Sequence, residues 1–216
     1  MRLLDLFCGR WGWSRAFAAR GWECVGVDIA APEDIPDRCF FRQDDVCELP
    51  MSFIKEGGFT FIVASPPCQE FAVHGMKHFH PNPPYPEIGI HLFNQTRAMC
   101  EASGIPYVME NVRAAEQFVG RAVFACGPFA LWGTGVPILF PKGITKAITV
   151  AAQGDLRGAE RKLPAAEKRR IRLERGGDLY RMSSKQRAAL SAKILPELAN
   201  CVCDHAEWLL EQRKSA

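Results

Sequence analysis

Two residues in this sequence have the types and positions needed for chemistry, and each lies at the end of a strand-like run. Cys68 follows the apolar run Phe61–Ala64 and a pair of prolines, which stop the run and stiffen the turn. A thiol held rigidly at a strand end is a candidate nucleophile, although a small cysteine packed under a loop is the commoner arrangement. Glu110 lies near the end of a second run, Ile105–Val112, which also predicts a strand.

Another acid follows a glycine turn near the N-terminus. The sequence predicts a strand over Leu3–Phe7, a tight turn over Cys8–Gly12, a helix over Ser14–Arg20 and a strand over Glu23–Asp28. Strand, glycine turn, helix, strand and acid in this order are typical of a nucleotide-binding βαβ unit. In such a unit Asp28 would bind the hydroxyls of a ribose.

Strands continue to alternate with helices further along the chain. We predict strands over Phe40–Val46 and Phe59–Ala64, and a helix over about 88–103 that leads into the strand ending near Glu110. This alternation favours a Rossmann-like α/β fold with a doubly wound, mostly parallel sheet. Parallel strands end at one edge of a sheet, so Cys68 and the acids are expected to meet there.

The composition is that of one ordinary globular domain. The chain has 216 residues, of which 48% are hydrophobic and 24% are charged. We expect no transmembrane helix, because the apolar runs are short, and no signal peptide, because the N-terminus leads directly into a strand. Nine scattered cysteines fit reduced thiols in a cytoplasmic protein, and a net charge of +3 permits a polyanionic partner without requiring one.

Two segments have open interpretations. Basic residues interleaved with acids fill 155–181, either as a solvated surface or as a phosphate-contacting element. The loop around His74, His78 and His80 is better suited to closing over a bound base than to holding zinc, so we expect no metal. A capping-box pattern at 183–186 predicts a helix to about residue 194, and 196–213 supplies the final helices.

Four motifs in order give the sequence a family resemblance. They are Asp5–Gly9 (DLFCG), Val25–Asp28 (VGVD), Ser65–Gln69 (SPPCQ) and Glu110–Val112 (ENV). Together they resemble the DNA (cytosine-5) methyltransferases, and the chain is most similar to short phage or prophage members. Ser191–Ala199 resembles, more weakly, the C-terminal motif that completes the cofactor pocket. The resemblance implies a methyltransferase fold. It also implies that the protein is located in the cytoplasm of a bacterium or a phage-infected host.

The resemblance also implies a division of the chain and a reaction. Residues 1–141 would form the catalytic core, 142–182 a basic insert in place of a target-recognition domain, and 183–216 C-terminal helices that complete the core. Cys68 would add to C6 of a cytosine flipped out of duplex DNA, and protonated Glu110 would hold N3. Arg113 or Arg121 would substitute for the family's arginines by holding the cytosine carbonyl or a phosphate, although either is equally explained as a surface arginine. The methyl donor would be S-adenosylmethionine. Its predicted contacts are Phe7, Gly9, Gly12, Asp28, Ile29, Asp45, Val46, Pro66 and Ala192.

The sequence also departs from the family pattern. Trp11, preceded by Arg10, replaces the middle glycine of the turn and could alter the donor pocket, so a modified donor is an alternative. The paired arginines expected after the Glu110 strand are replaced by Gly133–Leu139, which contains none. With only a short recognition segment, sequence specificity would be weak or supplied by a helper protein. Three alternatives therefore stay open: an RNA substrate, a modified donor, and a catalytically weak DNA-binding homologue.

Overall fold

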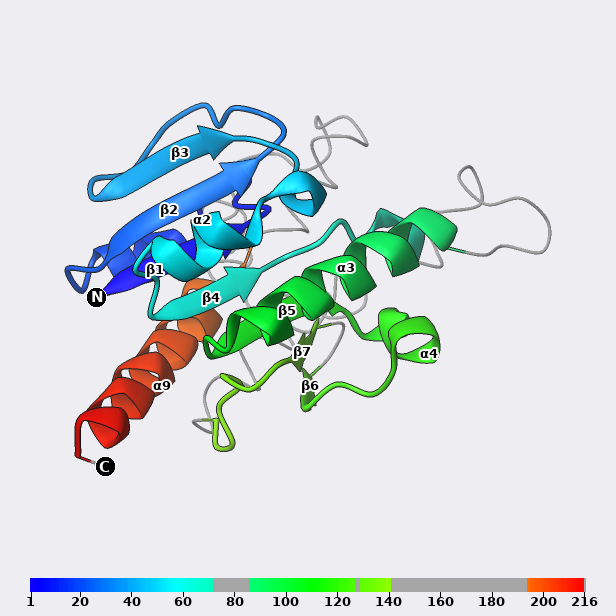
Figure 1. The fold of residues 1–216 in the computed structure, drawn as a ribbon. Helices are drawn as coiled ribbons and strands as arrows, with labels where there is room; N and C mark the ends of the chain where they lie inside the picture. Colours follow the sequence, from blue (N-terminus) through cyan, green and yellow to red (C-terminus); the bar gives the residue numbers. More distant parts are fainter. Residues whose placement is uncertain (72–85, 127–128, 141–193, 216) are drawn as a thin grey trace, which may run out of the picture.

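The computed structural model of the chain describes residues 1–71, 86–126, 129–140 and 194–215. Within these ranges the strands form one seven-stranded sheet in the order β3-β2-β1-β4-β5-β7-β6 (Figure 1). The strands are β1 (Arg2–Leu6), β2 (Glu23–Asp28), β3 (Cys39–Gln43), β4 (Phe61–Ala64), β5 (Tyr107–Val112), β6 (Phe124–Cys126) and β7 (Phe129–Trp132). The first five are parallel, whereas β7 runs antiparallel to both β5 and β6. This confirms the predicted Rossmann-like, doubly wound, mostly parallel sheet.

Helices cover both faces of the sheet. They are α1 (Ser14–Ala18), α2 (Met51–Glu56), α3 (Glu87–Ser103), α4 (Glu116–Val119) and α9 (Pro196–Ser215), with 3-10 turns η1 (Val46–Glu48), η2 (Gln69–Phe71) and η3 (Arg113–Ala115). The sheet is apolar on both faces because its strands are buried on both sides. Leu3 and Phe61 pack with α1 and α9, whereas Leu4 and Ile62 pack with α2, α3 and α4. Among the described residues, no helix combines the length and apolarity needed to cross a bilayer.

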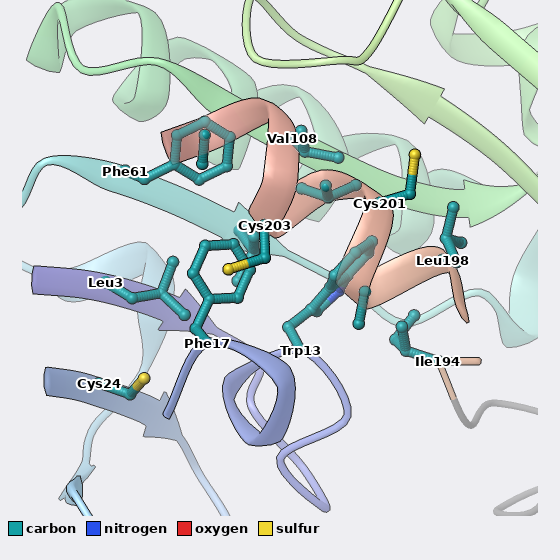
Figure 2. Packing of buried hydrophobic residues seen from close by; sticks show 14 of the residues in the cluster. Leu3, Trp13, Phe17, Cys24, Phe61, Val108, Ile194, Leu198, Cys201 and Cys203 are labelled. Atoms are coloured by element: carbon teal, nitrogen blue, oxygen red, sulfur yellow. The ribbon is translucent and has the colours of Figure 1, made fainter. Parts of the chain in front are cut away.

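The C-terminal helix is fixed to the N-terminal part of the chain. In Figure 2, Leu198, Cys201 and Cys203 of α9 lie among the same buried side chains as Trp13 and Phe17. At the rim of this core, the indole Nε1 of Trp22 donates to Glu207 at 3.1 Å, and Arg20 pairs with Asp204 and Glu207. Residues from the two ends of the described chain therefore share one core.

Several predicted boundaries differ from the structure. The third strand ends at Gln43 rather than Val46, because the Asp45 carboxylate accepts a hydrogen bond from the Cys47 amide at 2.9 Å and caps η1. The β6–β7 pair and α2 were not predicted, and the final helices are one helix, α9. The predicted insert at 142–182 and the helix predicted to begin at 183 lie outside the described residues, apart from Ile194. All eight cysteines with described side chains are free thiols.

Trp11 belongs to the core rather than to a binding surface. Its side chain is fully buried and lies over Gly26 in the middle of β2, with its indole Nε1 bonded to the Asp34 carbonyl at 2.9 Å. A Cβ atom at Gly26 would lie 2.3 Å from Cζ3 of Trp11 and 2.8 Å from Sγ of Cys8. The observation that suggested a modified donor is therefore explained by packing, because the indole fills space that glycine leaves on the strand.

This packing gives the first prediction. Gly26→Ala is expected to lower the free energy of unfolding by about 1–3 kcal/mol, because the new methyl group overlaps a buried, rigid indole. Urea denaturation of the two proteins measures the difference. In a Trp11→Leu background the same Gly26→Ala change is expected to cost clearly less, since a smaller side chain leaves room for the methyl group. Equal costs in both backgrounds would contradict this packing.

Candidate active site

The register of the sheet brings the predicted site residues to one edge. Leu6 of β1 is paired with Val27 of β2 and Ala64 of β4, and Ala64 is paired with Met109 of β5. The residues that follow these four in the sequence are Phe7, Asp28, Ser65 and Glu110. They therefore come at the same level, at the carboxyl ends of four neighbouring parallel strands. This is the edge at which open α/β sheets bind ligands.

The segment that carries Cys68 is held against β5 by a buried asparagine. Asn111 has no exposed surface, and its Nδ2 donates to the Pro66 carbonyl at 2.9 Å while its Oδ1 accepts from the Val112 amide at 2.9 Å. On the other side of the cysteine, the Phe71 amide donates to the Cys68 carbonyl at 3.0 Å and forms η2. The Cys68 thiol is therefore presented by a braced turn and stays partly exposed.

Burial shifts the ionisation of both Cys68 and Glu110, and the charge of Glu110 adds to the shift at Cys68. Burial, followed by the negative charge of Glu110, raises the pKa of the Cys68 thiol to about 11. Burial also raises the pKa of Glu110 to about 7, against the opposing effect of a hydrogen bond from Ser65. Both groups therefore stay protonated to a higher pH than they do in water, because burial disfavours their charged forms. A carboxyl that is substantially protonated at neutral pH can act as an acid there.

The interaction gives a second prediction, on thiol reactivity. Glu110→Gln removes the negative charge that opposes the thiolate, so the pKa of Cys68 falls and alkylation of Cys68 by iodoacetamide at about pH 8 is expected to become several-fold faster. Peptide mapping by mass spectrometry follows each cysteine separately.

The chain offers a matched control for this experiment. Glu48 raises the pKa of the thiol of Cys47 in the same way, although as a smaller cause than burial and Asp45. Glu48→Gln is therefore expected to speed alkylation of Cys47 and to leave the rate at Cys68 unchanged. An unaltered rate at Cys68 in Glu110→Gln would show that the two groups do not interact.

The glycine turn after β1 is closed by Asp28. The carboxylate of Asp28 accepts from the Gly9 amide at 3.1 Å and from the Ala30 amide at 3.0 Å. Phe7 and Gly9 both adopt left-handed backbone conformations, with φ of 60° and 47°. Such a conformation is costly for an aromatic residue and is found where a turn is shaped for function. Next to Asp28, the side chain of Ile29 is 70% exposed, which leaves an apolar surface beside the carboxylate.

Other predicted cofactor contacts have structural roles in the described chain. A Cβ at Gly12 would lie 2.9 Å from Cβ of Ile194, so glycine is needed there for the C-terminal segment to approach. Val46 is buried in the core beneath α2 and α3, and Asp45 is the cap of η1. Pro66 is buried and binds Asn111 through its carbonyl, whereas Ala192 lies outside the described residues.

Arg113 is placed differently from the other two predicted catalytic residues. It lies in η3, directly after β5, and its side chain is mostly exposed. Its guanidinium Nε is 3.6 Å from Glu116 Oε2, at the protein surface. The described structure therefore brings Cys68 and Glu110 together but directs Arg113 toward Glu116.

Three contributing residues were not assigned a role from the sequence. They are Trp13, Ser65 and Asn111, which connect the strand ends by hydrogen bonds. Ser65 and Asn111 lie within the motifs that carried the resemblance, so a polar residue in the same motif as a predicted catalytic residue was the available signal. Among the described residues, no group of three or more histidine, cysteine or acidic side chains could hold a metal ion, and His74, His78 and His80 lie outside them.

Comparisons with known proteins give limited similarity. No protein-family model matches the sequence, and no curated protein matches it. Among solved structures, a mutant of DNMT2 from Spodoptera frugiperda is similar over 54% of this chain and 37% of its own, with 23% identity and a TM-score of 0.33. The glycopeptide N-methyltransferase MtfA is similar over 51% of this chain and 46% of its own, with 18% identity and a TM-score of 0.30. The matches thus span less than half of either of those chains.

Proposed function

We propose that the protein is an S-adenosylmethionine-dependent methyltransferase that methylates C5 of cytosine in DNA through a covalent adduct with Cys68. The observation that carries the proposal is the interacting pair of Cys68 and Glu110 at the ends of neighbouring parallel strands. A thiol and a carboxyl of raised pKa, on two segments that Asn111 joins through the Pro66 carbonyl, would supply the nucleophile and the acid that this reaction requires. The motifs that contain these residues support the same assignment.

The chemistry explains why both groups are needed. Cytosine C5 is a poor nucleophile until the Cys68 thiolate adds to C6 and breaks the aromaticity of the ring. The electron pair displaced from the C5–C6 bond makes C5 enamine-like, and the Glu110 carboxyl gives its proton to N3, where negative charge develops. C5 then attacks the methyl group, whose bond to the sulfonium sulfur breaks, so that the donor would leave as a neutral thioether. A base removes the C5 proton, N3 returns its proton, and Cys68 leaves as the C5–C6 double bond forms again.

The residues around the glycine turn fit the donor. S-adenosylmethionine supplies an electrophilic methyl group on a sulfonium, together with a ribose diol and an apolar adenine ring. The Asp28 carboxylate, fixed by the Gly9 amide, is an acceptor suited to the diol. The exposed side chain of Ile29 provides an apolar surface suited to the adenine, and the left-handed backbone at Phe7 shapes the turn beside which the donor would lie. Asp45 and Val46 are proposed to contact the edge of the adenine. Because the Asp45 side chain caps η1 and the Val46 side chain is buried, we propose that this contact is made by the backbone at the start of η1.

The proposed substrate is duplex DNA, from which the target cytosine is flipped so that C6 can reach Cys68. Incubation with methyl-labelled S-adenosylmethionine and duplex DNA, single-stranded DNA or transfer RNA tests this directly. We expect label in DNA, recovered as 5-methylcytosine after digestion. Label in RNA alone would show that the substrate is RNA rather than DNA. No transfer to any of them, while calorimetry detects binding of the donor or of DNA, would leave a binding protein instead of an enzyme.

Specificity is proposed to depend on a partner or on the basic segment at 142–182. Arg113 is proposed to contact a phosphate of the DNA, because its guanidinium is mostly exposed and lies 3.6 Å from Glu116, which is longer than a hydrogen bond. Adding bacterial extract during the labelling experiment shows whether a helper protein narrows the methylated sequences.

A further inference from the structure

Ser65 connects the two halves of the candidate site through its hydroxyl group. On one side, the indole Nε1 of buried Trp13 donates a hydrogen bond to Ser65 Oγ at 2.9 Å. On the other side, Ser65 and Glu110 directly follow the paired residues Ala64 and Met109 of neighbouring strands, and a hydrogen bond from the Ser65 side chain opposes the rise in the pKa of the Glu110 carboxyl. Trp13 comes from the segment just before α1, Ser65 from the end of β4 and Glu110 from β5. The three side chains form a bridge across the strand ends.

The chemistry of the three groups gives this bridge a direction. An indole N–H donates and has no acceptor, so the Ser65 oxygen accepts from Trp13. A hydroxyl has only one proton, and that proton is then directed to Glu110. The carboxyl oxygen that accepts from Ser65 is the better acceptor when it is the carbonyl oxygen. When Glu110 is neutral, its proton is therefore favoured on the other oxygen.

We propose that Ser65 is a positioning residue that fixes the proton of neutral Glu110 on the carboxyl oxygen left free for the substrate base, and that Trp13 sets the direction of this bridge. The part about the base rests on the proposed function, whereas the bridge itself does not. Within the described chain, the titratable group that faces Glu110 is the Cys68 thiol. Arg113 is directed to Glu116 instead.

Direct titration of Glu110 tests the bridge without any substrate. The full chain is labelled with carbon-13 at the glutamate carboxyl, and the Glu110 signal is assigned by its loss in Glu110→Gln. Ser65→Ala is expected to raise the pKa of Glu110 by about one pH unit, because a donor to the carboxylate is lost. Trp13→Phe keeps a packed ring but removes the N–H, and is expected to give a smaller rise.

The double variant is the sharper test, since Trp13 acts only through Ser65. In a Ser65→Ala background, Trp13→Phe is expected to leave the pKa of Glu110 unchanged. Ser65→Thr retains the hydroxyl and is expected to titrate like the wild type, which separates the bridge from packing. An unchanged pKa in Ser65→Ala, equal effects of Trp13→Phe in both backgrounds, or a Ser65→Thr variant that titrates like Ser65→Ala would each overturn the inference. If Ser65→Ala does not fold, Trp13→Phe and Ser65→Thr decide it.

Kinetics on the same variants separate this inference from the proposed function. Ser65→Ala is expected to lower kcat for methyl transfer about tenfold with little change in KM, since the misplaced proton matters in the transition state. Absence of methyl transfer in the wild type would contradict the proposed function but not the bridge. An unchanged pKa of Glu110 in Ser65→Ala would contradict the bridge but not the proposed function.

Discussion

Cys68→Ser is expected to lower methyl transfer to DNA on the order of 10⁴-fold or more, as removal of a covalent nucleophile does in other enzymes. A serine hydroxyl is almost entirely protonated at neutral pH and is a poor nucleophile without an activating base. The substitution changes one atom in a turn that is braced by backbone contacts at Pro66 and Phe71, so the fold is expected to be retained. Transfer of label from methyl-labelled S-adenosylmethionine measures the loss.

A second cysteine provides the control for this experiment. Cys201 lies on α9 and is buried in the core on the opposite side of the sheet from α3. Cys201→Ala is expected to retain activity within a few-fold. Donor binding by calorimetry is expected to stay unchanged in Cys68→Ser, because the thiol acts on the base. Full activity in Cys68→Ser would exclude the covalent route.

Glu110→Gln is expected to lower methyl transfer by about 10²–10⁴-fold, the usual contribution of a positioned acid. Glutamine keeps the size of the side chain and can still donate a hydrogen bond to N3, but it cannot give up a proton. The loss therefore measures proton transfer rather than shape. The Cys68 alkylation described above should at the same time become faster, so that a more reactive thiol accompanies a slower enzyme.

The pH dependence of kcat/KM distinguishes this mechanism further. The reactive form, with neutral Glu110 and ionised Cys68, carries the same number of protons as the resting form with ionised Glu110 and a thiol. With pKa values of about 7 and about 11, its fraction is constant between these values and falls as the pH drops below about 7. In Glu110→Gln only the thiol titrates, so the rate is expected to keep rising with pH above 7. A wild-type rate that also rises steeply there would contradict the assignment of Glu110 as the acid.

The sheet and the position of the site could be predicted because they depend on short apolar runs and on the residues that end them. Phe61–Ala64 is buried over its whole length, and the acids and Cys68 follow strands that the register aligns. The direction of parallel strands then decides which side chains meet. The positions of Cys68 and Glu110 near the ends of neighbouring strands followed from these runs alone.

The rest depends on contacts that only the folded chain reveals. Trp11 looked like a pocket residue because it stands in the glycine turn, yet Gly26 leaves a space on β2 that the indole fills. A glycine inside a strand was the available signal for such a close approach. Ser65 accepts a hydrogen bond from Trp13, which is far from it in the sequence. Gly12 lies against Ile194, which is near the other end of the chain.

Capture of the covalent adduct tests the role of Cys68 most directly. DNA that contains 5-fluorocytosine in place of cytosine is incubated with the protein and S-adenosylmethionine, then digested and analysed by mass spectrometry. Fluorine at C5 cannot be removed as a proton, so Cys68 cannot leave after the methyl group has been added. We predict one cross-link, between Cys68 and a methylated 5-fluorocytosine, that is absent in Cys68→Ser. Methylation of ordinary DNA by a protein that forms no such adduct, or an adduct at another residue, would contradict the central role of Cys68.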